Sequence, residues 1–101
     1  MDYRVILSKP SLRDLGRIAR YIAQDNPPAA ERVGMELVRL AESLRALPAR
    51  GALLRSRPGV RRLLSNPYFL LYRVDESTAS STCCAFGTRS RIPRRFGSTE
   101  P

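Results

Sequence analysis

The sequence predicts an α+β fold in which an N-terminal pair of helices packs on one face of a β-sheet. Apolar residues recur at helical spacing through most of the first half of the chain. In the second half, apolar residues dominate two short runs that flank a turn, which is typical of a β-hairpin. Because the apolar stripes of the helices need a surface to cover, and the hairpin supplies one, we expect a single domain.

The first expected element is a short strand at residues 3–7, and the first helix follows it. Ser8 or Ser11 can cap this helix, and Pro10 suits its first turn. The helix is expected to end near Asp25. Its apolar stripe consists of Leu12, Leu15, Ile18, Ala19 and Ile22.

A compact signal begins the second helix at Asn26, whose side chain can cap the helix before Pro27 and Pro28. The short connection implies a tight antiparallel helix pair. Pro48 is expected to terminate this helix. Its exposed face mixes acidic and basic residues, so its glutamates are expected to be solvated helix charges rather than acid catalysts. The apolar stripe consists of Ala30, Val33, Leu37, Leu40, Ala41, Leu44 and Leu47.

The predicted hairpin consists of strands at Val60–Leu64 and Tyr68–Val74, joined by a short loop. Successive residues of a strand point to opposite faces, so Arg61 and Arg62 are expected on opposite sides of the sheet. The second strand is largely apolar on both faces. This pattern predicts a central strand that is covered on both sides.

The net charge is the strongest feature of the composition. Eighteen basic residues stand against nine acidic ones, giving +9, and every basic residue except Lys9 is an arginine. Residues 50–57 form a basic connection in which Leu53 and Leu54 are expected to turn inward. Arginine binds phosphates and carboxylates and stays ionised, so we expect a nucleic acid or an acidic protein as partner.

The sequence gives no indication of a membrane protein, a secreted protein or a metal- or cofactor-binding protein. No apolar run approaches the roughly 18 residues of a membrane-spanning helix, and the N-terminus lacks the features of a signal peptide. We therefore expect a cytoplasmic protein without a membrane partner. Cys83 and Cys84 are adjacent and the sequence has no histidine, so both are expected to be reduced thiols. We expect neither a metal site nor a cofactor, because no such motif occurs.

Taken in order, the predicted elements are a strand, a helix pair, a basic connection and a hairpin. Over residues 3–76 the chain resembles the RelE/ParE family of bacterial type II toxin–antitoxin toxins. Its sequence at residues 21–27 is more similar to the ParE branch than to the RelE branch. The resemblance implies an antiparallel sheet of about four strands, in the order β-α-α-β-β-β, with the helix pair on one face. The matching residues include Tyr3-Arg4-Val5, Arg20-Tyr21-Ile22, Asp25-Asn26-Pro27, Ala41-Glu42-Ser43-Leu44, Pro58-Gly59-Val60-Arg61 and Tyr72-Arg73-Val74.

The resemblance also implies a cognate antitoxin as partner and a toxin–antitoxin hetero-oligomer. ParE-like members inhibit DNA gyrase by binding it, whereas RelE-like members cleave mRNA on the ribosome. We expect a ParE-like toxin that inhibits growth by binding gyrase and is not an enzyme. The alternatives are a ribosome-dependent mRNA endoribonuclease and an inactive antitoxin-binding module.

The residues that could serve these functions lie mainly on the matched strands. RNA cleavage needs a group that deprotonates the 2′-hydroxyl and cations that stabilise the phosphorane. Arginine is a poor base because it does not deprotonate, and Tyr72 is expected to be a packed strand aromatic. If the chain is a nuclease, the candidates are Arg61, Arg62, Tyr72 and Arg73. The antitoxin is expected to dock on apolar surface left open by the helix pair and sheet, and antitoxin or target to contact Arg55, Arg57, Arg61, Arg62 and Arg73.

The C-terminal end departs from the family pattern after Glu76. The family has a last strand ending in a tryptophan–histidine pair, but this sequence contains neither residue type. Read from the third base of Cys83 with plausible codons, residues 83–88 would encode Leu-Arg-Val-Trp-His. We therefore hypothesise a reading-frame shift, and the altered end predicts a weakened or inactive toxin.

The same departure sets the expected domain boundaries. Residues 1–86 are expected to form the toxin domain, in which residues 78–86 could pair as a strand but would bury little apolar area. Residues 87–101 are expected to form a basic, mobile tail. This tail would either grip nucleic acid non-specifically or remain a solvated end.

Overall fold

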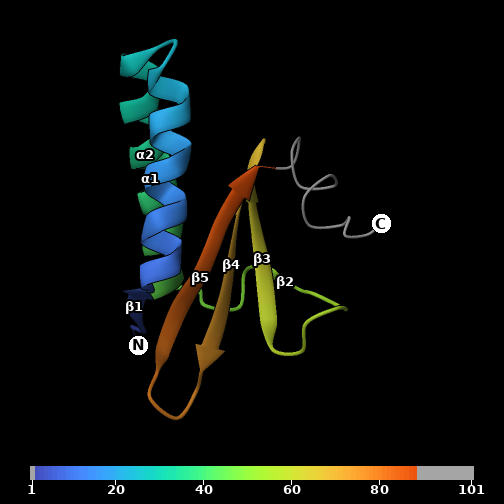
Figure 1. Ribbon diagram of the computed structural model, residues 1–101. Helices are drawn as coiled ribbons and strands as arrows, with labels where there is room; N and C mark the ends of the chain where they lie inside the picture. The colour runs from blue at the N-terminus through green and yellow to red at the C-terminus, as the bar shows by residue number, and fades with distance from the viewer. Residues whose placement is uncertain (1, 89–101) are drawn as a thin grey trace.

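The computed structural model describes residues 2–88, in which two helices lie on one side of a β-sheet (Figure 1). Among these residues, no helix is both long and apolar enough to cross a membrane. The helices are α1 (Lys9–Ala23), α2 (Pro27–Glu42) and the short 3-10 helix η1 (Ser43–Arg45). The strands are β1 (Arg4–Leu7), β2 (Ala52–Leu53), β3 (Val60–Ser65), β4 (Tyr68–Asp75) and β5 (Ser80–Thr88). The predicted α+β class is confirmed.

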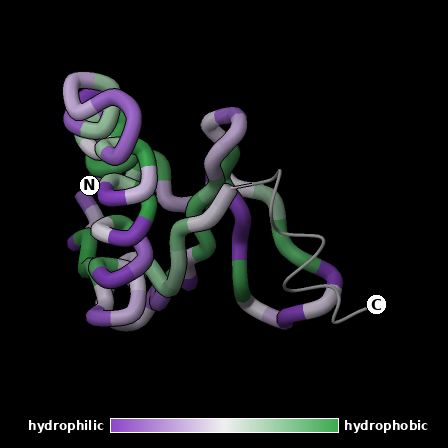
Figure 2. The backbone as a smooth tube through the Cα atoms, turned by 45° about the horizontal axis from the view of Figure 1, so that its top comes forward, coloured by the Kyte–Doolittle hydropathy of each residue, from purple (hydrophilic) through white to green (hydrophobic). Residues whose placement is uncertain are grey.

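The predicted helix pair is also confirmed, and capping residues explain where each helix begins. Ser8 caps α1, because its side chain accepts a hydrogen bond from the backbone N–H of Ser11 (3.2 Å). Asn26 caps α2 in the same way. Regular helix α2 gives way to η1 after Glu42, so it stops short of Pro48, the predicted end. Hydrophilic and hydrophobic stretches alternate along the helices, as amphipathic helices require (Figure 2).

The sheet has five strands in the order β1-β5-β4-β3-β2, one more than expected. The additional strand is β2, which pairs Ala52 and Leu53 with β3 inside the segment expected to be a connection. Leu53 is 60% exposed, so the expectation that it turns inward is wrong. The sheet is also not wholly antiparallel, because β1 runs parallel to β5. A parallel pair needs a long crossover, and the helices with the hairpin supply it. Strand β4 lies between β5 and β3, which confirms its predicted central position. Among residues 2–88 the expected cover on both sides is incomplete, because Leu71 is partly exposed and Arg73 is exposed on the face away from α2.

Strand β5 contributes more to the core than its composition suggested. The register with β4 shifts between Leu71 and Tyr72, which pair with Ala85 and Cys83, so Cys84 is an extra residue in the ladder. This bulge lets Cys83 and Phe86 both join the core cluster, although strict alternation would separate them. Both side chains are buried. The expectation that residues 78–86 bury little apolar area is therefore wrong.

Strand β5 includes Gly87 and Thr88, which were expected to belong to the tail. Residues 89–101, which include most of the expected tail, lie outside the described residues.

The hydrophobic core forms between α2, η1 and the side of the sheet that faces them. Leu37 and Leu44 from the helical segment meet Leu63, Leu70 and Tyr72 from the hairpin. Each of these side chains is at most 7% exposed. Tyr68 and Val74 of β4 also pack against this cluster, so the alternate residues of β4 face the helices as the predicted strand alternation requires.

We predict that the fold loses stability above about pH 9 because of Cys83. Burial raises the pKa of the Cys83 thiol from 9.0 to about 12. Between these values the folded state keeps a proton that the unfolded state releases. This share of stability is therefore fully present below pH 9 and is lost as the pH rises toward 12. The free energy of unfolding, measured by urea denaturation, should fall by up to about 1.4 kcal/mol per pH unit.

Cys83→Ala should remove this share of the pH dependence, whatever its effect on absolute stability. Cys84→Ala is the matched control, because Cys84 is only partly buried. Identical slopes above pH 9 in the unmodified protein and in both variants would contradict the prediction.

Candidate functional site

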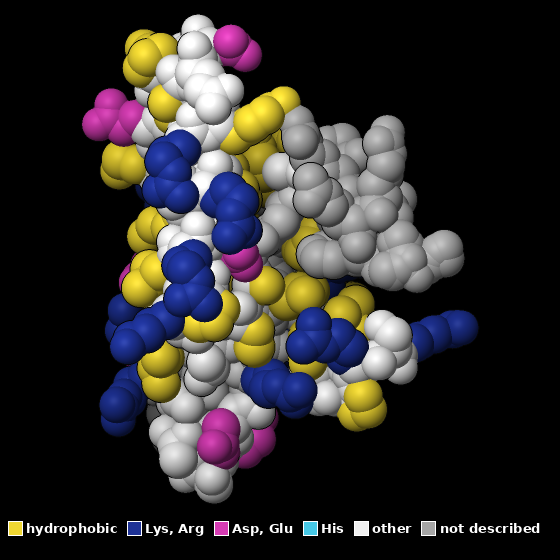
Figure 3. All heavy atoms as spheres, in the orientation of Figure 1, with side chains coloured by type: hydrophobic (Ala, Val, Ile, Leu, Met, Phe, Trp, Pro, Cys, Tyr) yellow, Lys and Arg dark blue, Asp and Glu magenta, His cyan; other side chains and the backbone are white. Residues whose placement is uncertain are grey.

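A groove of about 1020 Å³ opens between α1 and the side of the sheet that faces away from α2. Its floor consists of Phe69, Leu71 and Ala85, which alternate along β4 and β5 with residues that pack on α2. One wall is the outer part of α1, and the other is the segment before β3. Figure 3 shows this face of the molecule, with apolar side chains lying between basic ones.

A glycine in β5 shapes the floor of the groove. The Phe69 ring packs directly on the backbone at Gly87, where an added Cβ atom would lie 2.5 Å from the ring. Phe69 is only 4% exposed despite lying on the outer face of the sheet. A larger residue at position 87 would have to displace this ring, so the glycine fixes the depth of the groove.

The rim of the groove carries more positive than negative charge. Arg57 and Arg62 lie on the sheet side, and Asp14 and Arg17 lie on the α1 side. The Asp14 carboxylate accepts hydrogen bonds from Arg17 Nη1 (3.0 Å) and from the backbone N–H of Phe86 (3.3 Å). Among residues 2–88, Arg57 and Arg62 form no ion pair. The rim is therefore suited to a ligand that combines apolar and acidic groups.

The adjacent residues Arg61 and Arg62 lie on opposite faces of β3, as the alternation predicts. Arg62 is exposed and lines the groove. Arg61 points the other way, where its Nη1 atom donates hydrogen bonds to the carbonyl oxygens of Gly51 (2.6 Å) and Ala49 (3.3 Å). Arg61 therefore stabilises the turn before β2, while Arg62 is available to a ligand.

The other three arginines predicted as contacts have different surroundings. Arg57 lines the groove, whereas Arg55 is exposed on the same segment without lining it. Arg73 lies on the groove face of β4, and its Nη1 atom donates to the carbonyl oxygen of Pro58 (3.2 Å). The structure thus gathers Arg57 and Arg62 at the groove and leaves Arg55 and Arg73 at its periphery.

Tyr72, the candidate acid or base of the nuclease alternative, is a fully buried strand residue. Its hydroxyl donates to the carbonyl oxygen of Pro48 (2.7 Å) and accepts from the N–H of Gly51 (2.9 Å). Burial raises the pKa of this hydroxyl. A Cβ atom at position 51 would lie 2.8 Å from it, so the turn depends on a glycine there. These contacts are those of a packed aromatic that fixes the 48–51 turn.

The structure adds groove residues that the sequence did not single out. Ile18, Tyr21 and Ile22 of α1 belong to the wall, and Phe86 of β5 lies beside them. Tyr21 is 56% exposed, which is high for an aromatic residue near an apolar surface. The exposure of Tyr21 is the feature that identifies the α1 wall of the groove. It could not be read from the sequence, because exposure depends on the fold. Among the described residues, no group of three or more metal-ligating side chains comes together.

The fold defines the class of the protein: a small α+β domain in which a helix pair covers one face of a five-stranded mixed sheet. A family model described as the ParE toxin of the type II toxin–antitoxin system parDE matches residues 5–93. The chain therefore belongs to the ParE toxin family of type II toxin–antitoxin systems. A search of curated proteins finds no match to the chain.

Solved structures of toxins share this fold. The RelBE2 toxin–antitoxin complex from Mycobacterium tuberculosis contains a chain with 27% identity and a TM-score of 0.69, covering 88% of this chain and 100% of that one. A chromosomal ParDE system from P. aeruginosa matches with 20% identity and a TM-score of 0.73, covering 85% and 95%. A mutant of the E. coli toxin RelE in the free state has 20% identity and a TM-score of 0.54, covering 99% and 94%.

We predict that Tyr72→Phe lowers the stability of the fold but does not abolish growth inhibition, because the Tyr72 hydroxyl has a structural role. The variant keeps the ring but leaves the Pro48 carbonyl and the Gly51 N–H without their partner. The free energy of unfolding should decrease by about 1–3 kcal/mol, measured by chemical denaturation. Any growth inhibition should persist at temperatures where the variant is folded.

Tyr68→Phe serves as the control, because it removes a hydroxyl from a partly buried tyrosine of the same strand. Its stability should change by less than half as much. Loss of growth inhibition by a folded, normally stable Tyr72→Phe protein would overturn this prediction and point to a chemical role.

Proposed function

We propose that this chain is a ParE-like toxin that acts in the cytoplasm, inhibits growth by binding DNA gyrase and is neutralised by a cognate antitoxin. The main support for this proposal is the match of the ParE toxin family model over residues 5–93. The placement of Tyr72 supports binding rather than catalysis, because its buried hydroxyl is occupied by Pro48 and Gly51. The altered C-terminal end is expected to weaken the inhibition rather than the fold.

The groove is the proposed docking site for the antitoxin. Its apolar floor would bury the apolar face of a partner segment, and burial of such surface is the main source of binding energy. Arg57 and Arg62 at the rim would attract acidic residues that flank this segment. An acidic, amphipathic antitoxin segment satisfies both requirements, and the complex would be a toxin–antitoxin hetero-oligomer.

A ribosome-dependent mRNA endoribonuclease is the second candidate. It is favoured by the 27% identity to a chain of the RelBE2 complex. Of its predicted catalytic residues, Arg62 and Arg73 are exposed on the groove side of the sheet, where they could contact RNA phosphates. Arg61 and Tyr72 are engaged with the 48–51 turn. An inactive antitoxin-binding module is the third candidate, because the usual end of the family is absent.

Induced expression in a bacterial host separates the three candidates. The gyrase proposal predicts growth arrest with rising DNA-damage signalling and intact mRNA, and the purified protein should inhibit supercoiling by gyrase. Rapid loss of translated mRNA with cuts inside codons would replace this proposal by the nuclease. Binding of the antitoxin without any effect on growth would support the inactive module.

We predict that the double variant Arg57→Glu and Arg62→Glu weakens antitoxin binding. The substitutions place carboxylates where the rim now offers guanidinium groups to acidic residues. Kd should rise at least about tenfold, and the dependence of Kd on salt should become shallower. Isothermal titration with the antitoxin encoded beside the toxin gene measures both quantities.

Arg32→Glu and Arg39→Glu provide the matched control. They change the net charge equally, but both arginines lie exposed on α2, which contributes nothing to the groove. Their Kd should stay within about twofold of the unmodified protein. An equal loss in the two double variants would show that net charge, and not the groove, governs docking.

A further inference from the structure

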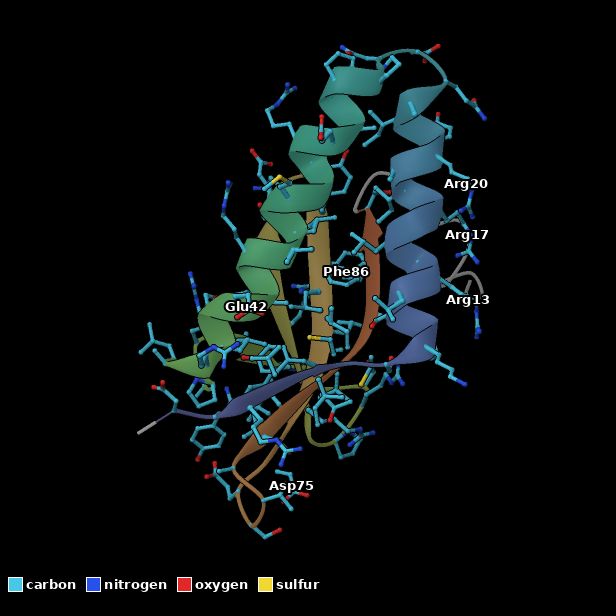
Figure 4. All side chains as sticks on the ribbon, turned by 90° about the vertical axis from the view of Figure 1, so that its left-hand side faces the viewer. Arg13, Arg17, Arg20, Glu42, Asp75 and Phe86 are labelled. Atoms are coloured by element: carbon cyan, nitrogen blue, oxygen red, sulfur yellow. The ribbon has the colours of Figure 1, made fainter. Side chains whose placement is uncertain are left out.

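Helix α1 carries a second basic surface, which neither the groove nor the core uses as a whole. It consists of Lys9, Arg13, Arg17 and Arg20, and we call it the α1 basic stripe. At 100° per residue these four positions fall within an arc of about 80°, so they share one side of the helix. Figure 4 shows the three arginines following one another along α1 and pointing away from α2. All four side chains are exposed.

Most of the cations in the α1 basic stripe have no carboxylate partner among the described residues. Arg17 pairs with Asp14 at 3.0 Å. Within the described part of the chain, Lys9, Arg13 and Arg20 form no ion pair. Asp14 is also hydrogen-bonded to the backbone of Phe86, so it is not free to move along the stripe. Four cations therefore face solvent with one fixed carboxylate at their side.

The neighbouring helix shows that this charge is not a general property of the helix pair. Helix α2 carries Glu31, Arg32, Glu36, Arg39 and Glu42, so acidic and basic residues nearly balance. Helix α1 carries the four cations and only Asp14. Two helices of similar length in one hairpin thus differ strongly in charge. A need for solubility alone would not place the cations on one helix and in one line.

The shape of the stripe fits a regular polyanion better than a protein surface. A protein interface normally has an apolar centre. The line from Lys9 to Arg20 holds only cations and Gly16, and the exposed apolar residues of α1, Leu12 and Tyr21, lie on either side of this line rather than within it. The Arg20 guanidinium lies over this gap, 3.3 Å from where a Cβ atom of Gly16 would stand. From Lys9 to Arg20 the helix rises about 16 Å. Measured along the axis of a duplex, this length covers about five base-pair steps at about 3.4 Å each.

We propose that the α1 basic stripe binds the phosphate backbone of a nucleic-acid duplex. Binding would be electrostatic and independent of base sequence, because guanidinium groups recognise phosphates wherever the backbone presents them. The stripe would hold the toxin close to a target that itself carries DNA or RNA. This proposal does not rest on the identity of that target, since both gyrase and the ribosome work on nucleic acid.

Fluorescence anisotropy of labelled duplex DNA with the full-length protein tests the proposal. The test variant is Arg13→Gln with Arg20→Gln, because these exposed arginines have no carboxylate partner among residues 2–88. The control is Arg32→Gln with Arg39→Gln on α2, which removes the same charge. Arginines outside the described residues are identical in both variants, so their contribution cancels.

The test variant should bind DNA at least about tenfold more weakly at moderate salt. The slope of log K against log salt should also become shallower by about 1.8, corresponding to two lost phosphate contacts. The control should change affinity by less than about twofold. An RNA duplex of the same sequence, titrated in parallel, identifies which backbone the stripe prefers.

Three results would overturn the proposal. The first is a lack of binding to either duplex at low salt, and the second is an equal effect of the two double variants. The third is binding of polyglutamate as tight as that of DNA with the same loss in the test variant, which would assign the stripe to an acidic protein. Circular dichroism of each variant ensures that the helices are intact, which is expected because every substituted side chain is exposed.

Discussion

The arrangement of this domain depends on the pairing of β5 along both of its edges. Residues 80–83 pair in parallel with β1, and residues 80–88 pair antiparallel with β4. The backbone N–H of Phe86, beyond the end of β1, donates instead to Asp14 of α1. Backbone hydrogen bonds hold the strand whatever its side chains, which explains how a segment rich in serine, threonine and cysteine occupies an inner position of the sheet. The buried Ser81 hydroxyl, which lacks a partner among the described residues, shows the cost of this composition.

Sequence reasoning succeeded where the determining contacts are local. The caps at Ser8 and Asn26, the helix pair and the hairpin of β3 and β4 follow from residues a few positions apart. It failed where distant segments meet. The parallel pairing of β1 with β5 joins residues more than seventy positions apart, and β2 is too short to leave a periodic pattern. The bulge at Cys84 reverses the alternation within β5, so the burial of Phe86 could not be derived from spacing.

The candidate site shows the same division. Alternation along β3 correctly placed Arg61 and Arg62 on opposite faces. The separate expectation that Tyr72 is a packed strand aromatic agrees with its full burial on β4. It could not show that Arg61 serves the 48–51 turn, because that contact depends on how the loop folds back. An open apolar surface beside the helix pair and sheet was expected, but the walls and floor of the groove could not be predicted. Its walls come from α1 and from the segment before β3, and its floor requires the close approach of Phe69 to Gly87.

The two basic surfaces meet at Arg17, which lines the groove and belongs to the α1 basic stripe. Its guanidinium group is held by Asp14, and Asp14 is held in turn by the backbone of β5. Strand β5 therefore holds α1 at the point where the two surfaces meet. The two surfaces differ in where the apolar side chains lie. They form the floor of the groove beside Arg57 and Arg62, whereas Leu12 and Tyr21 only border the α1 basic stripe. The arginines of the groove and those of the α1 basic stripe are therefore suited to different partners. Apolar contact adds affinity for a peptide and adds none for a phosphate backbone.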